Sequence, residues 1–353
     1  SQNSENGLLF VNHEYTNTNL MFAGLGEGRD MAEKITREQA DVELSAHGAA
    51  IVEIRKAGNA WQVVENSRYN RRISGLTTAM AVSGPARGHD RLKTSADPSG
   101  ARVIGTINNC AGGITPWGTV LTAEENFNQY FMGPADTLPQ AASYKRYGVS
   151  GKSPYGWGRF HDRFDLAKEP NEPNRFGWLV EIDPYEPDSV PVKRTALGRF
   201  KHEGADIIVN KDGRIVVYSG DDERFDYVYR FVSAGRYDAA NRRNNLGLLD
   251  QGTLSVARYN ADGTLNWLPL VHGQGPLNAA NGFASQTDIA IETRRAADLV
   301  GATKMDRPED IETNPTSGHV FLMLTNNTSR KADQLDKTNP RASNAHGHIV
   351  EMI

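Results

Sequence analysis

Short strand-like runs joined by tight turns recur along most of this 353-residue chain. The dipeptides Asp212-Gly213 and Asp262-Gly263 favour two-residue hairpin turns, because aspartate and glycine accept the backbone angles that such turns require. The predicted strand pairs are 49–56 with 61–64, 102–107 with 119–122, 177–182 with 192–197, 206–209 with 214–218, and 252–259 with 265–268, and a further strand is predicted at 319–325. Repeated local pairs predict an antiparallel all-β fold, and the pattern alone leaves a propeller, a sandwich and a barrel open.

One early strand and two helices complete the predicted elements. Residues 7–15 read as a buried strand, which at this early position needs a partner from elsewhere in the chain. Thr36 and Gln39 fit a capping box, so we expect a short helix over 36–46. A second helix is predicted over 288–300, with a cap at its start and a glycine just past its end.

The segment 133–174 has little periodicity and is rich in proline, glycine, tyrosine and tryptophan. Long loops of this kind either line functional sites or decorate the surface, and composition does not separate the two. The length and the 38% hydrophobic content allow one large domain or two ordinary ones.

The charge balance and the cysteine count limit the classes of function. With 39 basic and 43 acidic residues, the net charge of −4 gives no electrostatic case for nucleic-acid binding. No apolar run approaches the length of a membrane span, and no charged start precedes an apolar segment, so we expect neither a membrane span nor a targeting segment. One cysteine excludes an intrachain disulfide.

The most informative stretch is 108–131, which contains the only cysteine, a Gly-Gly pair, a Pro-Trp-Gly turn and two adjacent acids. If it forms a β-hairpin, Cys110, Glu124 and Glu125 lie at the strand ends as a mixed sulfur and oxygen ligand set for a metal ion. The same residues also fit a buried apolar cysteine beside a solvated pair of acids.

Further acids follow strands in two other motifs. In H-E-G-A-D, Glu203 and Asp206 flank a glycine turn before a strand, and in S-G-D-D-E three acids follow a buried strand directly. Clustered carboxylates repel one another, so they stay together only with cations between them or water around them. For Asp222 and Glu223 we expect solvated loop acids.

The segment R-P-E-D puts a guanidinium and two carboxylates within one turn. Arg307 can bind a phosphate through its planar fork while Glu309 ligates a metal that touches the same anion. An ordinary ion pair that holds a loop in place is the alternative. Arg341, His346 and His348 are expected to be structural.

Several common catalytic motifs are absent from the sequence. There is no G-x-x-x-x-G-K-[ST] loop, no G-x-G-x-x-G that opens a helix, no G-x-S-x-G elbow and no H-E-x-x-H. Phosphate-loop, dinucleotide-binding, serine-hydrolase and zincin chemistries are therefore excluded.

Taken together, these motifs resemble those of the PhoX-type alkaline phosphatases. The resemblance runs from about Gly7 to the last residue, with its motifs in one order. They are N-N-C-A-G-G to Q-Y-F at 108–131, N-H-E at 12–14, H-E-G-A-D at 202–206, Y-S-G-D-D-E-R-F-D-Y-V-Y-R-F at 218–231, D-R-P-E-D at 306–310, and N-P-R-A to G-H-I-V at 339–350.

The resemblance implies a single β-propeller domain, with the active site at a central channel that binds iron (Fe3+) and several calcium ions (Ca2+). It implies that Cys110 is the thiolate ligand of iron and that Arg307 binds the substrate phosphate. The implied carboxylate ligands are Glu125, Glu203 and Glu309, with Glu14 and Glu124 as further candidates.

The activity implied is metal-assisted hydrolysis of phosphomonoesters at alkaline pH, with release of phosphate, in an exported periplasmic or secreted protein that we expect to be a monomer. Members of this family continue beyond a segment like 347–353, so we expect this chain to be truncated at both ends relative to the family, with further blades and at least one acidic ligand missing. Two alternatives therefore stay open: a non-catalytic calcium-binding propeller fragment, and a propeller esterase or lactonase that needs neither Cys110 nor Arg307.

Overall fold

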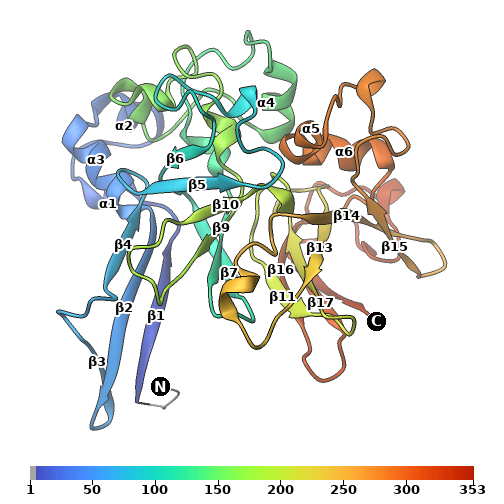
Figure 1. Cartoon of the computed structure of the whole chain (residues 1–353). Coiled ribbons are helices and arrows are strands. Elements are labelled where there is room, and N and C mark those ends of the chain that lie inside the picture. The colour runs from blue at the N-terminus through green and yellow to red at the C-terminus, as the bar shows by residue number, and fades with distance from the viewer. Residues whose placement is uncertain (1–4) are drawn as a thin grey trace.

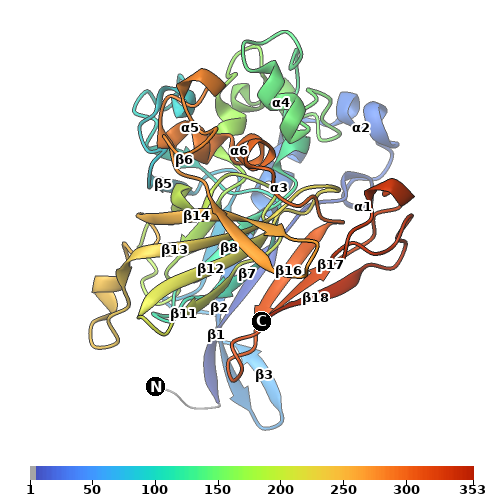
Figure 2. The same ribbon diagram turned by 90° about the vertical axis from the view of Figure 1, so that its right-hand side faces the viewer.

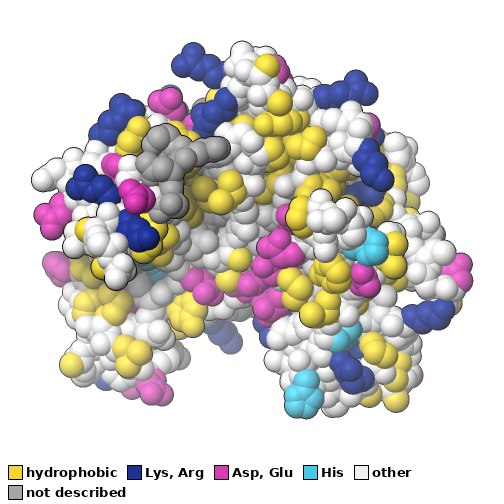
Figure 3. All heavy atoms as spheres, turned by 90° about the horizontal axis from the view of Figure 1, so that it is seen from below, with side chains coloured by type: hydrophobic (Ala, Val, Ile, Leu, Met, Phe, Trp, Pro, Cys, Tyr) yellow, Lys and Arg dark blue, Asp and Glu magenta, His cyan; other side chains and the backbone are white. Residues whose placement is uncertain are grey.

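The computed structural model of the chain describes residues 5–353, apart from the side chain of Arg29. Its strands form four separate sheets, and its helices gather at one end of these sheets (Figures 1 and 2). Seen from the opposite end, acidic side chains gather near the centre of the molecule (Figure 3). No helix among the described residues is long and apolar enough to cross a membrane.

The first sheet contains the early strand that the sequence predicted, although this strand is half-exposed and not buried as expected. Its members are β1 (Asn6–His13), β2 (Gly48–Ala57), β3 (Ala60–Val63) and β4 (Arg71–Ser74). Strand β1 pairs antiparallel with β2, from Asn6 opposite Arg55 to His13 opposite Gly48. The predictions of a distant partner for this strand and of the β2–β3 hairpin are therefore confirmed.

The second sheet has the order β6-β5-β10-β9-β8-β7. Its members are β5 (Ala79–Ser83), β6 (Arg102–Ile104), β7 (Asn109–Ile114), β8 (Val120–Glu124), β9 (Leu179–Ile182) and β10 (Val192–Arg194). All of its pairs are antiparallel except β5 with β10. The predicted β9–β10 pair is confirmed.

The predicted pairing of 102–107 with 119–122 is wrong, because β6 pairs with β5 and β8 lies between β7 and β9. The stretch Asn109–Ile114 takes the place beside β8 instead. Its glycines permit the close approach, since a Cβ atom on Gly112 would lie 2.0 Å from the backbone oxygen of Leu121. The cysteine-containing stretch is therefore itself a strand.

The third sheet is a meander of five strands and the fourth has three strands. The third contains β11 (Asp206–Val209), β12 (Arg214–Gly220), β13 (Val228–Arg236), β14 (Gly252–Tyr259) and β15 (Leu265–Pro269). The fourth contains β16 (Pro308–Thr313), β17 (Val320–Leu324) and β18 (His348–Met352). The predicted β11–β12 and β14–β15 hairpins are confirmed, and their turn glycines, Gly213 and Gly263, have positive φ angles of 83° and 97°.

The helices agree with the sequence in part. Helix α3 (Arg37–Ala46) begins with the predicted capping box of Thr36 and Gln39. The predicted helix at 288–300 is in fact two helices, α5 (Gln286–Ile291) and α6 (Thr293–Val300). The helix breaks because Glu292 leaves helical geometry, while the Thr293 hydroxyl bonds to carbonyl oxygens of the last turn of α5. The other helices are α1 (Thr18–Met21), α2 (Gly28–Lys34) and α4 (Ala141–Tyr147).

The segment 133–174 contributes to the hydrophobic core. It contains α4 and short 3-10 turns, and it buries Tyr144, Trp157 and Phe164 almost completely. These rings belong to the same core cluster as Tyr130 of the stretch after β8. The segment therefore fixes the position of the chain just beyond the two adjacent acids.

Candidate metal and phosphate site

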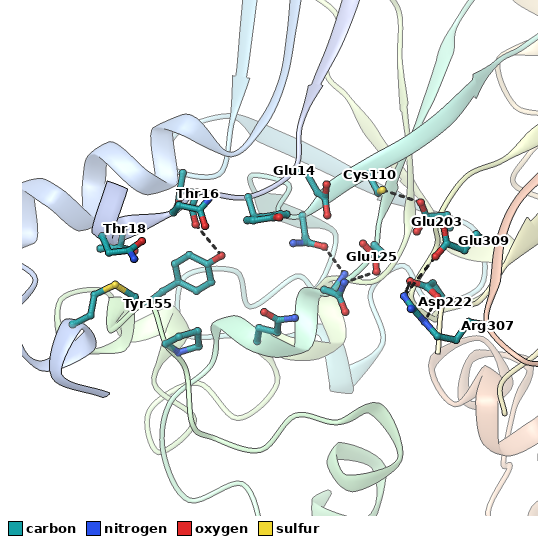
Figure 4. A pocket seen from close by; sticks show the side chains of 18 residues that line it. Glu14, Thr16, Thr18, Cys110, Glu125, Tyr155, Glu203, Asp222, Arg307 and Glu309 are labelled. Atoms are coloured by element: carbon teal, nitrogen blue, oxygen red, sulfur yellow. Dashed lines mark hydrogen bonds and ion pairs between the residues drawn. The ribbon is translucent and has the colours of Figure 1, made fainter. Parts of the chain in front are cut away.

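A pocket of about 560 Å³ lies at the open end of the β7–β8 hairpin. Its lining combines acids from distant segments with the only cysteine and one arginine (Figure 4). These residues are Glu14, Cys110, Glu125, Glu203, Asp222, Arg307 and Glu309. Five of the six predicted metal ligands thus line one cavity, together with the predicted phosphate-binding arginine.

The hairpin register brings the first two of these residues together. Asn109 lies opposite Glu124, so Cys110 near the start of β7 and Glu125 just after β8 share one end. Asn108 fixes this arrangement from a left-handed backbone conformation with φ 51°, which asparagine tolerates better than most residues. Its carbonyl oxygen accepts the N–H of Glu125 at 2.9 Å, and its side-chain oxygen accepts the N–H of Asn126 at 2.6 Å.

Glu203 arrives from the segment that leads into β11. Its backbone oxygen accepts the N–H of Ala111 at 2.8 Å, and the Cys110 thiol donates to its Oε1 at 3.0 Å. Burial, followed by the charges of neighbouring acids, raises the pKa of Glu203 to about 7. Burial and the adjacent Glu203 also raise the pKa of the Cys110 thiol.

Two groups of donor atoms are compact enough to hold metal ions, with all atoms of each group within 4.8 Å of one another. One group is Glu14, Cys110 and Glu125, and the other is Glu125, Glu203 and Asp222. Glu125 belongs to both groups, and burial together with the Glu203 and Asp222 charges raises its pKa to about 9. A thiol combined with carboxylates is a chemically reasonable ligand set for cations that would offset this repulsion.

Arg307 is the cation among the described pocket-lining side chains. Its Nε and Nη2 donate to the two carboxylate oxygens of Asp222 at 2.9 and 2.7 Å, and its Nη2 lies 3.5 Å from Oε1 of Glu309. The Asp222 side chain is 4% exposed, whereas that of Arg307 is 28% exposed. The guanidinium is therefore held in a fixed orientation and still reaches the pocket.

Glu124 is not part of this arrangement. Its Oε1 accepts from the Lys193 ammonium at 2.6 Å and from the Thr106 hydroxyl at 2.8 Å, and its Oε2 accepts the N–H groups of Gly177 and Trp178. Glu124 and Lys193 are both fully buried. This carboxylate is satisfied by protein donors and fixes the end of β8, one residue before Glu125.

The expectation that Asp222 is a solvated loop acid is wrong, because its carboxylate is buried and bound by Arg307. Its position two residues after the buried strand β12 is the one sequence signal that favours burial. Glu223 is half-buried and pairs with Lys201 at 2.8 Å instead. Asp206 lies within β11 opposite Tyr218 and does not line the pocket.

Comparison with known proteins is consistent with this geometry. A family model described as alkaline phosphatase PhoX matches residues 1–353. A solved structure of Pseudomonas fluorescens PhoX, in complex with vanadate as a transition state analogue, matches with a TM-score of 0.93 and 44% sequence identity. The match covers 99% of this chain and 61% of that one, so this chain spans about three-fifths of that protein's length. No curated protein matches the chain.

Proposed function

The chain belongs to the alkaline phosphatase PhoX family, and from this premise we propose that its pocket binds metal ions and hydrolyses phosphomonoesters at alkaline pH, releasing inorganic phosphate. One observation carries the proposal: Cys110, Glu125, Glu203 and Asp222 converge from separate segments beside Arg307. The vanadate bound in the similar structure is described there as a transition state analogue, which agrees with phosphoryl chemistry in that protein.

The proposed cofactors are iron (Fe3+) and calcium (Ca2+). The donor set fits both ions, because a thiolate suits iron and clustered carboxylate oxygens suit calcium. Cys110 would hold iron, and the carboxylates that would complete the metal shell are Glu14, Glu125, Glu203, Asp222 and Glu309. When bound, such ions would polarise the phosphoryl oxygens and offset the charge of the acids.

The protein residues would position these groups and the substrate. Arg307 would bind a phosphoryl oxygen through its accessible N–H groups, and Asp222 would keep the guanidinium aimed at the pocket. Asn108 and Asn126 would hold Glu125 in place, since the Asn126 amide also donates to the Glu125 carboxylate. Burial of Glu125 and Asp222 would keep most water away from these two carboxylates, which strengthens their interactions with cations.

The finer architectural expectations are part of the same proposal. The four sheets are proposed to be blades of one β-propeller domain. Family membership also supports export to the periplasm or the medium. A monomeric state stays a prediction.

The test combines metal analysis with hydrolysis by one preparation of this chain. We expect iron and calcium in the purified protein and turnover of p-nitrophenyl phosphate at alkaline pH, with loss of turnover after chelation and recovery after both ions are restored. p-Nitrophenyl acetate serves as the comparison substrate. Turnover of the acetate alone would favour an esterase, and bound calcium without any turnover would favour a non-catalytic domain.

A further inference from the structure

The pocket is divided into a charged end and an uncharged end. The acids and Arg307 lie on one side of Figure 4, whereas Thr16, Thr18 and Tyr155 lie on the other. The uncharged wall comes mainly from residues 15–19, which directly follow Glu14. A group attached to a phosphate at the charged end can therefore reach this wall within the same pocket.

The wall is anchored to a buried carboxylate. The hydroxyls of Thr16 and Thr18 both donate to Oε1 of Glu43, which is fully buried in helix α3. The other oxygen of Glu43 accepts from Nε1 of Trp157 at 2.8 Å, and the Tyr155 hydroxyl donates to the backbone oxygen of Thr16 at 3.4 Å. The wall is thus held from behind by the core rather than by its own exposed side chains.

The residues that alternate with these anchors are exposed and also line the pocket. Tyr15 is 54% exposed, and Asn17 and Asn19 are exposed as well. Asn17 occupies the N-cap position of α1, where asparagine usually bonds to the first turn, yet its side chain makes no capping hydrogen bond. Its amide is therefore available to a ligand.

A further amide that lines the pocket comes from another segment. Gln129 is the exposed member of the 3-10 turn η2 (Phe127–Tyr130), whose Phe127 and Tyr130 are completely buried. It lies four positions after Glu125 and also lines the pocket. Its side chain, like that of Asn17, has no hydrogen-bond partner within residues 5–353.

We propose that Tyr15, Asn17, Asn19 and Gln129 form a subsite for the organic part of the substrate, and that this part is an uncharged ring bearing hydroxyl groups, as in a sugar phosphate. The inference rests on the proposed phosphatase function. Primary amides offer both donors and acceptors, which matches hydroxyl groups, and an exposed tyrosine offers an apolar ring face with a polar edge. A site built from hydrogen-bonding groups discriminates against ligands that lack the matching group.

Two phosphate esters of primary alcohols test the subsite. Glucose 6-phosphate carries the hydroxylated ring and ethyl phosphate does not, while their leaving groups are chemically alike. Loss of one hydrogen bond costs about 1 kcal/mol, so Asn17→Ala and Gln129→Ala should each lower kcat/KM for glucose 6-phosphate about fivefold more than for ethyl phosphate. Gln62→Ala, in the remote strand β3, is the matched control and should change neither value.

If the Asn17→Ala and Gln129→Ala variants lose kcat/KM equally for both esters, or for neither, the subsite is refuted. The proposed phosphatase function is not affected by that result. If the wild-type protein hydrolyses neither ester, the proposed function fails, and binding then decides the subsite separately. In calorimetry with the metal-loaded protein, glucose 6-phosphate should bind more tightly than ethyl phosphate, and Asn17→Ala should reduce that difference. Equal affinities in the wild-type protein would refute the inference.

Discussion

The Cys110 thiol lies 3.0 Å from Oε1 of Glu203, although the two residues are 93 positions apart in the chain. The contact joins the second sheet to the segment that enters the third. It is supported by the backbone bond from Ala111 to Glu203 and by close packing, since a Cβ atom on Gly113 would lie 2.0 Å from the backbone oxygen of Ala205. The sulfur and the carboxylate are therefore held together by the backbone around them.

The first prediction concerns Cys110→Ser. Because the backbone positions this site, the variant should fold normally, whereas its harder hydroxyl should hold iron poorly. We expect bound iron and phosphatase turnover to fall by at least about tenfold, with an unchanged circular dichroism spectrum and melting temperature before metal loading. Elemental analysis and turnover of p-nitrophenyl phosphate measure the effect. Wild-type iron content and activity in the variant would remove the thiolate from the metal site.

Arg307 provides the second prediction. Lysine keeps the charge but lacks the planar pair of N–H donors that binds both oxygens of Asp222, so Arg307→Lys should lose the fixed orientation of the cation. Competitive inhibition by inorganic phosphate should weaken about tenfold or more, with iron and calcium contents unchanged. Arg224→Lys is the matched control, because Arg224 is exposed, lies two positions after Asp222 and does not line the pocket. Equal phosphate inhibition in both variants would contradict a role of Arg307 in phosphate binding.

The sequence predicts the part of the site that depends on local register. A hairpin over 108–131 places Cys110 and Glu125 at one end whatever the rest of the fold does. The sequence does not show which of Glu124 and Glu125 faces the pocket. Neighbouring strand residues point to opposite faces, and two adjacent acids do not reveal which face is buried in the core. The residue that binds the Glu124 carboxylate, the buried Lys193, is 69 positions away from it in the sequence.

The same limit explains the other differences. Asp222 looks like a loop acid until Arg307, 85 positions later, is placed against it. Hairpins closed by Asp-Gly are predictable since both strands and the turn are adjacent in sequence, as in β11–β12. The pairing of β6 with β5 is not predictable in this way, because β7 takes the place beside β8 that was predicted for β6. Which stretch pairs with which is decided by tertiary packing.

The third prediction compares the adjacent residues Glu124 and Glu125, whose substitution should affect the stability of the protein differently. Glu124→Gln would leave the buried Lys193 without its carboxylate, so the free energy of unfolding should fall by about 3–5 kcal/mol. Glu125→Gln would replace a buried carboxyl group, whose pKa is raised to about 9 by burial and neighbouring acids, with a neutral amide, so the metal-free protein should keep its stability or gain some, while metal binding weakens. Urea unfolding of the metal-free proteins, together with metal analysis, compares the two variants. If Glu125→Gln destabilises the protein as much as Glu124→Gln, Glu125 is also a structural acid.

The fourth prediction concerns acid stability and His47. Burial lowers the pKa of this fully buried histidine from 6.5 to about 4, and its ring nitrogens face the Glu43 carbonyl at 2.8 Å and the Tyr130 hydroxyl at 3.1 Å. The unfolded chain therefore binds a proton between pH 6.5 and 4 that the folded protein does not. Stability is unaffected above this range and falls as the pH decreases through it, by about 2 kcal/mol between pH 7.5 and pH 5.

His47→Gln should lower stability at pH 7.5, because the imidazole bonds and packing are lost, yet it should reduce the decrease between pH 7.5 and pH 5 by the same amount of about 2 kcal/mol. The neutral amide does not titrate, so the unfolded variant gains no proton at this position. Urea unfolding of the metal-free protein at the two pH values measures both quantities, and His346→Gln, at an exposed position, is the matched control. An equal pH dependence in the wild-type protein and in His47→Gln would show that His47 is protonated within the folded core, and that other groups cause the acid sensitivity.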